Sequence, residues 1–255
     1  MDLSIWTVVF LVAMFFLAGF VDSIAGGGGL IAVPSLLVAG IPSAIALGTN
    51  KMAATPGTIS ALINYARNGL VMWRIGLIGI PFCIIGSAIG TNTLLIFDNE
   101  TIGKIIIFLL PVGIIANFIP KKATSVQAVI SPIKLYLVAP LVCLVIGFYD
   151  GFFGPGAGSF FVIAFHYIVG MELVKATATA KLFNAVTGVS ALIVFAINGQ
   201  FILWLAIPLA IANIAGSLIG SQLAIKIGAA FIKKILSASL LLLFVTLIWK
   251  FFIAG

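Results

Sequence analysis

The chain has 255 residues, of which 63% are hydrophobic and only 7% are charged, whereas about 25% of the residues of a soluble domain are charged. So few charged side chains cannot cover the surface of a water-soluble domain, which excludes that class of protein. The formal net charge of +7 would suggest nucleic acid for a soluble protein. In a membrane protein the lysines and arginines instead orient the loops, and we expect no nucleic-acid partner.

Ten apolar segments follow one another, and most have the roughly 17–25 residues that a membrane-spanning helix needs. They are Leu3–Val21, Leu30–Leu47, Ala44–Ala66, Ile75–Phe97, Ile102–Ile119, Leu135–Phe148, Phe160–Val169, Leu173–Ile197, Phe201–Ile225 and Ile235–Ile253. The second and seventh are short or broken. The runs are continuous rather than alternating, which favours helices over a β-barrel. The sequence therefore predicts an all-α polytopic membrane protein whose single domain spans residues 1–255.

The second half of the chain repeats the first. GFVDSIAGGGG from Gly19 recurs as GFYDGFFGPGAG from Gly147, which aligns Asp22 with Asp150. Three further matches keep the same order: ALINYARNG from Ala61 with ALIVFAING from Ala191, GSAIG from Gly86 with GSLIG from Gly216, and Lys51 with Lys181. Matches in register indicate a duplication, with repeats at about 1–127 and 131–255 that hold five segments each.

Five segments per repeat would turn the second repeat upside down in the membrane. The loop after the third segment holds Arg67 and Arg74, whereas its counterpart has no charge. The loop after the fourth segment is net acidic, but its counterpart carries Lys226, Lys233 and Lys234. Because positive loops stay cytoplasmic, equivalent loops would lie on opposite sides, and the repeats are predicted to be inverted.

Two consequences and one alternative follow from this topology. The linker with Lys121, Lys122 and Lys134 would also be cytoplasmic, and both termini would lie on the other side. In the alternative, segments two and seven are re-entrant, each half spans the membrane four times, and the repeats are parallel. That arrangement would put charge-rich and charge-free versions of one loop on the same side, so we favour the inverted one.

Glycine-rich interruptions at matching places in two repeats are typical of secondary transporters. Glycine lets the backbone approach a ligand, and a helix that starts after such a loop presents free N–H groups to an anion. We therefore take the following glycines as candidate substrate-binding residues: Gly26, Gly28, Gly154 and Gly156. The alternative is close helix packing. We assign GSAIG and GSLIG to packing, because they lie within full-length segments.

Lys51 and Lys181 are the stronger candidates for a substrate site. Lys51 lies eight residues into its segment, about 12 Å along a helix, and Lys181 lies similarly deep. A snorkelling lysine stays nearer the helix end, and deeper charges usually have a function. With no carboxylate next to them on their helices, the two lysines would attract an anion. Neighbouring hydroxyls and amides that can donate to anion oxygens complete the predicted cluster, which adds Thr49, Asn50, Thr179 and Asn184.

Three further residues are candidates for proton coupling. His166 is the only histidine and can relay a proton near neutral pH, although packing is the more common role of a lone histidine. Asp22 and Asp150 could carry protons or could cap the helices that follow them.

No catalytic set is present in the sequence: it has no phosphate loop, no HExxH and no Ser/His/Asp arrangement. Cys83 and Cys143 lie in apolar runs without metal or redox spacing, so we interpret them as small core residues. We expect no enzyme activity, no metal and no cofactor.

Both repeats resemble one transporter family. The stretch GFVDSIAGGGGLIAVPSLL, with GTNKMAATPGTISALINYARNG after it, is similar to the TauE/SafE (TSUP) permeases, as are GFYDGFFGPGAGSF and TATAKLFNAVTG. The resemblance covers essentially the whole chain and implies a prokaryotic inner-membrane transporter of sulfite or organosulfonates such as sulfoacetate. The halves differ, because Ala180 aligns with Asn50 and Pro155 with Gly27, so the two half-sites cannot be equivalent.

The first functional hypothesis is therefore a secondary transporter of small sulfur-containing anions, with alternating access around a site near the middle of the membrane. The alternative is an uncoupled anion channel that uses the same lysines. The expected partners are the anion and the lipid bilayer, and long apolar faces with small-residue stripes suggest a homodimer.

Overall fold

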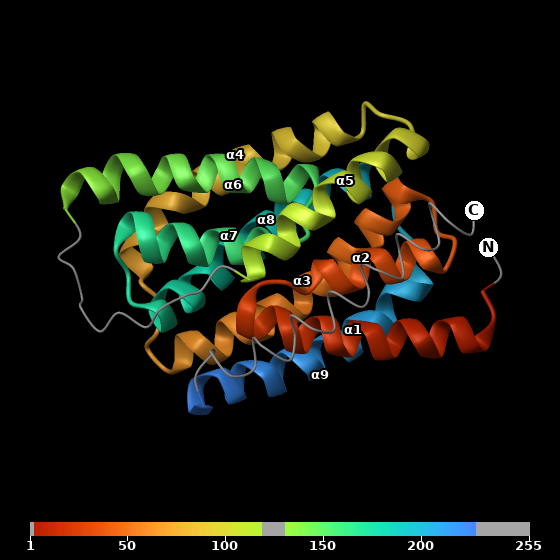
Figure 1. The fold of residues 1–255 in the computed structure, drawn as a ribbon, viewed down its shortest axis with the longest axis horizontal. Coiled ribbons are helices and arrows are strands. Elements are labelled where there is room, and N and C mark those ends of the chain that lie inside the picture. The colour runs from red at the N-terminus through yellow and green to blue at the C-terminus, as the bar shows by residue number, and fades with distance from the viewer. Residues whose placement is uncertain (1–2, 119–130, 228–255) are drawn as a thin grey trace.

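The computed structural model describes residues 3–118 and 131–227, and every element in these ranges is a helix (Figure 1). The elements are α1 (Ile5–Ala25), α2 (Gly29–Val38), α3 (Ser43–Arg67), α4 (Trp73–Leu94), α5 (Asn99–Phe118), the π-helix η1 (Lys134–Val138), α6 (Ala139–Phe152), α7 (Ala157–Ile163), the π-helix η2 (Ala164–Val169), α8 (Leu173–Ile197) and α9 (Leu203–Ile227). The all-α fold class is confirmed for these residues. The following predicted features lie outside them: segment Ile235–Ile253, Lys121, Lys122, Lys233 and Lys234.

Five of the described helices are long and apolar enough to cross a membrane. They are Ile5–Ala25, Trp73–Leu94, Lys134–Phe152, Leu173–Ile197 and Leu203–Ile227. Their lengths match the roughly 17–25 residues that the hydrocarbon core requires. The helices therefore indicate a multi-pass membrane protein.

Two helices extend beyond the predicted segments in the same way. The first segment was predicted to end at Val21, but α1 continues through Asp22 to Ala25. The sixth was predicted to end at Phe148, but α6 continues through Asp150 to Phe152. In both helices the last turn contains the aspartate of the repeated motif.

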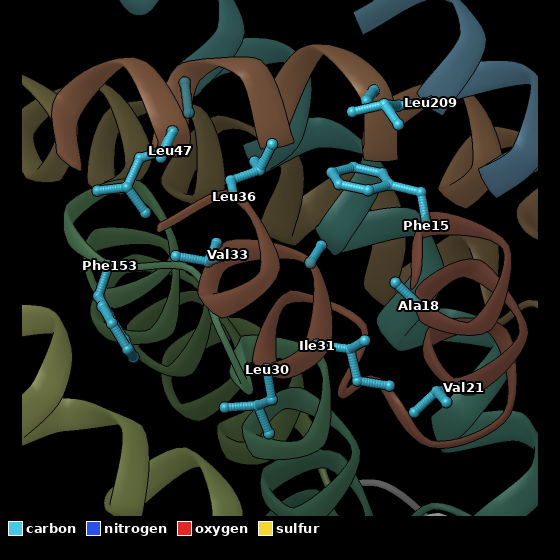
Figure 2. Close-up of a cluster of buried hydrophobic side chains, with 14 of the residues drawn as sticks. Phe15, Ala18, Val21, Leu30, Ile31, Val33, Leu36, Leu47, Phe153 and Leu209 are labelled. Atoms are coloured by element: carbon cyan, nitrogen blue, oxygen red, sulfur yellow. The ribbon is translucent and has the colours of Figure 1, made fainter. Parts of the chain in front are cut away.

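The second and seventh segments form short helices, as predicted. Helix α2 has 10 residues, so it is about 15 Å long, half of a hydrocarbon core of about 30 Å. Helix α7 and η2 together cover Ala157–Val169 and are also too short to span. Figure 2 shows side chains of α2, such as Leu30 and Leu36, among those of α1, α9 and Phe153. Since α2 is apolar and buried all round, it is enclosed by protein rather than by lipid.

The two halves are interleaved, because the fourth helix of each half packs along the first helix of the other. Helix α4 lies beside α6, and α9 lies beside α1 (Figure 1). A methyl group at Gly86 would collide with the carbonyl of Leu144, and one at Gly216 with that of Phe16. The predicted packing role of GSAIG and GSLIG is therefore confirmed.

Polar contacts across these helix pairs also occur at matched positions. The Asn213 amide donates to the carbonyl of Phe15 over 3.1 Å. At the corresponding place in the other half, the Cys83 thiol donates to the carbonyl of Cys143 over 3.6 Å. Both cysteines are buried and free, which confirms their predicted place in the core.

Candidate functional site

A polar cavity lies where α3, α8 and the two glycine-rich loops meet. The space inside it that the centre of a water molecule can reach is about 60 Å³, enough for a few waters or one small ion. Most of the predicted site residues line it, namely Asp22, Gly26, Gly28, Asn50, Lys51, Asp150, Gly154, Gly156 and Asn184. Sequence reasoning missed other lining residues, among them Thr58, Gly158, Gly188 and Asn213. Both halves of the chain therefore contribute to one cavity.

The two glycine-rich loops bound the cavity and touch each other. Gly26 has a φ of 81°, Gly154 of 91° and Gly156 of 86°, a left-handed conformation that favours glycine. A methyl group at Gly26 would collide with the backbone of Gly158, and the Ser159 hydroxyl donates to the carbonyl of Ala25 over 2.6 Å. These residues are small because the two halves approach each other closely here.

Position 28 requires glycine because a side chain would not fit there. Its backbone conformation is ordinary, with a φ of −57°. A methyl group there would lie 2.5 Å from the carbonyl oxygen of Ala18 and 2.6 Å from the β-carbon of Asp22. A larger residue at Gly28 would therefore displace α1 from the start of α2.

Lys51 forms an ion pair with the other half of the chain. Its Nζ lies 2.8 Å from Oδ1 of Asp150, and the two side chains are 10% and 8% exposed. The Thr187 hydroxyl donates to the second oxygen of that carboxylate. Within the described residues this is the only hydrogen bond of the Lys51 ammonium, which has three N–H donors. Donors are therefore left for a ligand in the cavity.

Lys181 forms the matching pair, but its surroundings differ. Its Nζ lies 2.9 Å from Oδ2 of Asp22 and also donates to the main-chain carbonyl of that residue. The Lys181 side chain is 0% exposed and does not line the cavity, whereas Asp22 does. The Asp22 carboxylate also accepts from Thr58 over 3.3 Å and from the N–H of Gly28 over 3.4 Å. Lys181 thus joins α8 to the last turn of α1, and the Asp22 carboxylate joins that turn to the start of α2.

Sequence reasoning did not pair these charges. The lysines have no carboxylate on their own helices, but the fold brings one from the opposite half to each. The predicted lysines and aspartates therefore belong to one constellation, in which two positive and two negative groups balance. Two buried cations and two aspartates in matching motifs were the available signal, because buried charges are normally paired.

Asn50 and Asn184 are the polar groups left without partners at the cavity. The Oδ1 atoms of both side chains are buried and accept no hydrogen bond in the described part of the chain. Buried polar groups are nearly always paired, and leaving one unpaired costs about 1–3 kcal/mol. The two amides do not occupy equivalent positions, because Asn184 aligns with Ala54 and Asn50 with Ala180. Both are placed to contact a ligand that enters the cavity.

Besides Lys181, three predicted site residues do not line the cavity. Thr49 accepts the N–H of Ile202 over 3.0 Å, and Thr179 accepts that of Met72 over 3.1 Å. These matched bonds fix the loops before α9 and α4. The buried His166 lies in η2, where its Nδ1 is 2.7 Å from the carbonyl oxygen of Met171.

Comparisons with known proteins identify the family of the chain. The family model described as sulfite exporter TauE/SafE matches residues 11–247. A probable membrane transporter protein of Haemophilus influenzae is 37% identical over 227 residues, which cover 89% of this chain and 87% of that protein. The probable membrane transporter protein YfcA of Escherichia coli K12 is 37% identical over 231 residues, 90% of this chain and 84% of YfcA.

A third relative, the probable membrane transporter protein ORF9 of a Sinorhizobium species, is 36% identical over 235 residues, 92% of this chain and 90% of its own length. No solved structure matches the chain. The family model covers most of the sequence, and these relatives are matched along nearly their whole length. The chain therefore belongs to the sulfite exporter TauE/SafE family.

Proposed function

We propose that the chain is a secondary transporter of small sulfur-containing anions, either sulfite or organosulfonates such as sulfoacetate. The anion binds in the cavity, near the middle of the membrane, and reaches each side in turn by alternating access. The observation that carries this proposal is a small polar cavity between the two halves, with an incompletely bonded lysine and two amides without partners.

The chemistry of the lining suits a sulfonate or sulfite group. Such a group offers three acceptor oxygens, and Lys51 offers a positive charge with unused donors. Charge-assisted hydrogen bonds are about twice as strong as neutral ones. The Asn50 and Asn184 amides can donate to the same oxygens, while waters that enter with the anion can donate to their Oδ1 atoms. Only one lysine reaches the cavity, so the anion is held without being trapped.

The arrangement of the helices supports inverted repeats as the basis of alternating access. Figure 1 shows α1 and α6, the first full-length helices of the two halves, running in opposite directions. The Lys51–Asp150 and Lys181–Asp22 pairs both cross between the halves. Rocking of the group formed by α1, α3 and α9 against the group formed by α4, α6 and α8 would therefore change the contacts around the cavity. Transporters built from such repeats use this movement.

Binding and transport measurements on the purified protein test the function. We expect methanesulfonate, sulfoacetate and sulfite to bind more tightly than acetate and sulfate. In proteoliposomes, unlabelled anion inside should drive saturable uptake of labelled anion. A steady ionic conductance without such counterflow would instead establish the channel alternative, and absence of both would refute a transport role.

Site-directed labelling tests the inverted topology. Asn68 and Asn198 end the matched helices α3 and α8, and both are exposed. With Cys83 and Cys143 replaced by alanine, single cysteines in place of Asn68 and Asn198 should react with an impermeant reagent from opposite sides. Reaction from the same side would refute the inverted arrangement.

A further inference from the structure

We propose that transport is coupled to protons through Asp150. A monovalent anion enters the cavity together with one proton, which binds the Asp150 carboxylate and releases Lys51 to the anion. This inference rests on the proposed transport function and adds the coupling ion, the group that carries it and the stoichiometry.

The charges of the two ion pairs at the cavity balance one another. The two ion pairs hold two positive and two negative groups, which sum to zero. An added monovalent anion would leave one uncompensated negative charge in a buried site, which is strongly unfavourable. Protonation of one carboxylate restores neutrality. A monovalent anion and one proton therefore form the neutral load of this site.

The two lysines differ in their access to the cavity. Lys51 lines the cavity, and the Asp150 carboxylate is the one hydrogen-bond partner of its ammonium within the described residues. Lys181 is 0% exposed, and besides the Asp22 carboxylate it is held by the Asp22 carbonyl, which protonation does not remove. Neutralising Asp22 would therefore free no cation that the anion can reach. Neutralising Asp150 frees Lys51.

The groups that face Asp150 leave the proton no better place to bind. Lys51 faces it from α3 and Thr187 from α8. Two other titratable side chains, Cys83 on α4 and Tyr149 on α6, lie close enough to interact electrostatically with the Asp150 carboxylate. Neither thiol nor phenol is negatively charged near neutral pH, so neither can take up the proton. His166, which lies in η2, donates from Nδ1 to the carbonyl oxygen of Met171, away from the cavity lining.

The proton step is an exchange of partners on Lys51. A proton from the bulk solution reaches the cavity through its water and adds to Oδ1 of Asp150, and the contact of 2.8 Å with Nζ of Lys51 loses its charge–charge character. The ammonium then turns one or more N–H groups to the anion oxygens. When the anion leaves, the proton leaves with it, because Lys51 again favours the charged carboxylate.

Proton counting tests the inference with methanesulfonate, the anion of a strong acid, which does not titrate near neutral pH. Saturating methanesulfonate is added to the detergent-purified protein in weakly buffered solution, and proton uptake is compared with the amount bound. We expect about one proton per anion. By linkage, the apparent Kd should rise about tenfold per pH unit wherever one proton is taken up.

Asp150→Asn is the decisive variant, because it keeps the shape of the side chain and removes the charge. It should bind methanesulfonate without taking up a proton and with an apparent Kd that no longer depends on pH. Asp98→Asn, which removes an exposed carboxylate between α4 and α5, is the matched control and should behave like the parent. Infrared difference spectra of the parent protein should show one carboxylic acid formed on binding, a result that does not depend on the folding of any variant.

The outcomes separate this inference from the proposed function. Binding and counterflow of methanesulfonate without proton uptake would overturn the coupling and leave the transporter intact. Proton uptake that persists in Asp150→Asn, or that forms no carboxylic acid in the parent, would overturn the assignment to Asp150. If no anion of the panel binds or moves, the proposed function fails, and the inference fails with it.

Discussion

The two ion pairs at the centre of the molecule are built from aligned residues but sit in different surroundings. Lys51 and Asp150 form a pair on the cavity wall, with a single bond from the ammonium. In the other pair, Lys181 is sealed from the cavity and bonds both the carboxylate and the carbonyl of Asp22. The aligned residues thus form two ion pairs between the halves, and we propose that one stays structural while the other exchanges its partner.

The loop beside each lysine accounts for part of the difference. A methyl group at Gly154 would lie 3.3 Å from Nζ of Lys51, so this glycine leaves room next to the ammonium. Its counterpart Gly26 packs against the backbone of Gly158 instead. The free side of Lys51 therefore faces the cavity.

The largest effect is expected from a substitution that breaks the Lys181–Asp22 ion pair. Lys181→Ala leaves the partly buried Asp22 charge without its partner, which should lower the free energy of unfolding by at most about 3–5 kcal/mol. Denaturant unfolding in mixed micelles would measure this loss. Combining Lys181→Met with Asp22→Asn should restore most of the stability, because no unpaired charge remains. If Lys181→Ala lowers the free energy of unfolding by less than Lys51→Ala does, the structural role of Lys181 is contradicted.

Lys51→Ala should weaken ligand binding in addition to lowering stability, because it also leaves the Asp150 carboxylate without its charged partner. Loss of a charged donor should weaken methanesulfonate binding by at least ~1.5 kcal/mol, measured by titration calorimetry. The matched control is Lys104→Ala, since Lys104 is paired with Glu100 on the surface and lies outside the cavity lining. If the Lys51 variant binds methanesulfonate as tightly as the parent does, Lys51 does not contact the ligand.

Substitutions at Gly26 and Gly154 test the difference between the two loops, with smaller expected effects on stability. Alanine at Gly26 or Gly154 must adopt a positive φ, which costs about 1–2 kcal/mol of stability. Gly26→Ala should lose more, because its methyl group also meets Gly158. Only Gly154→Ala should weaken methanesulfonate binding in addition. Equal stability and equal binding of the two variants would argue against the difference between the loops.

The smallest expected effects concern the amides. Asn50→Ala and Asn184→Ala should each weaken methanesulfonate binding by about 0.5–1.5 kcal/mol, one neutral hydrogen bond. Their unfolding free energies should not fall more than about 0.5 kcal/mol below that of the parent, because neither Oδ1 atom gives up a hydrogen bond. If these variants lose much stability but bind methanesulfonate like the parent, the two amides have a structural role and do not contact the ligand.

Much of the fold was predictable from the apolar pattern. Segment Leu173–Ile197 was predicted with the same bounds as α8, because polar residues flank a continuous run. The predictions ended α1 and α6 too early, since a single sequence gives no reason to continue an apolar helix past an aspartate. Lysines from the opposite half neutralise Asp22 and Asp150, so both helices continue.

The candidate site was predictable in its residues but not in its pairing. Depth and repetition pointed to Lys51 and Lys181, whereas their partners depend on how the halves interleave, which no local pattern contains. Thr49 and Thr179 shared that depth but bind the N–H groups of Ile202 and Met72. Proximity to a lysine along a helix does not place a side chain on the same face.

Thiol labelling tests the central claim, the difference between the two lysines, most directly. With Cys83 and Cys143 replaced by alanine, Lys51→Cys and Lys181→Cys are treated with a methanethiosulfonate reagent that carries a sulfonate group. We predict that Lys51→Cys reacts, that methanesulfonate protects it, and that Lys181→Cys reacts far more slowly. Equal rates for the two cysteines, or no protection of Lys51→Cys, would contradict the account.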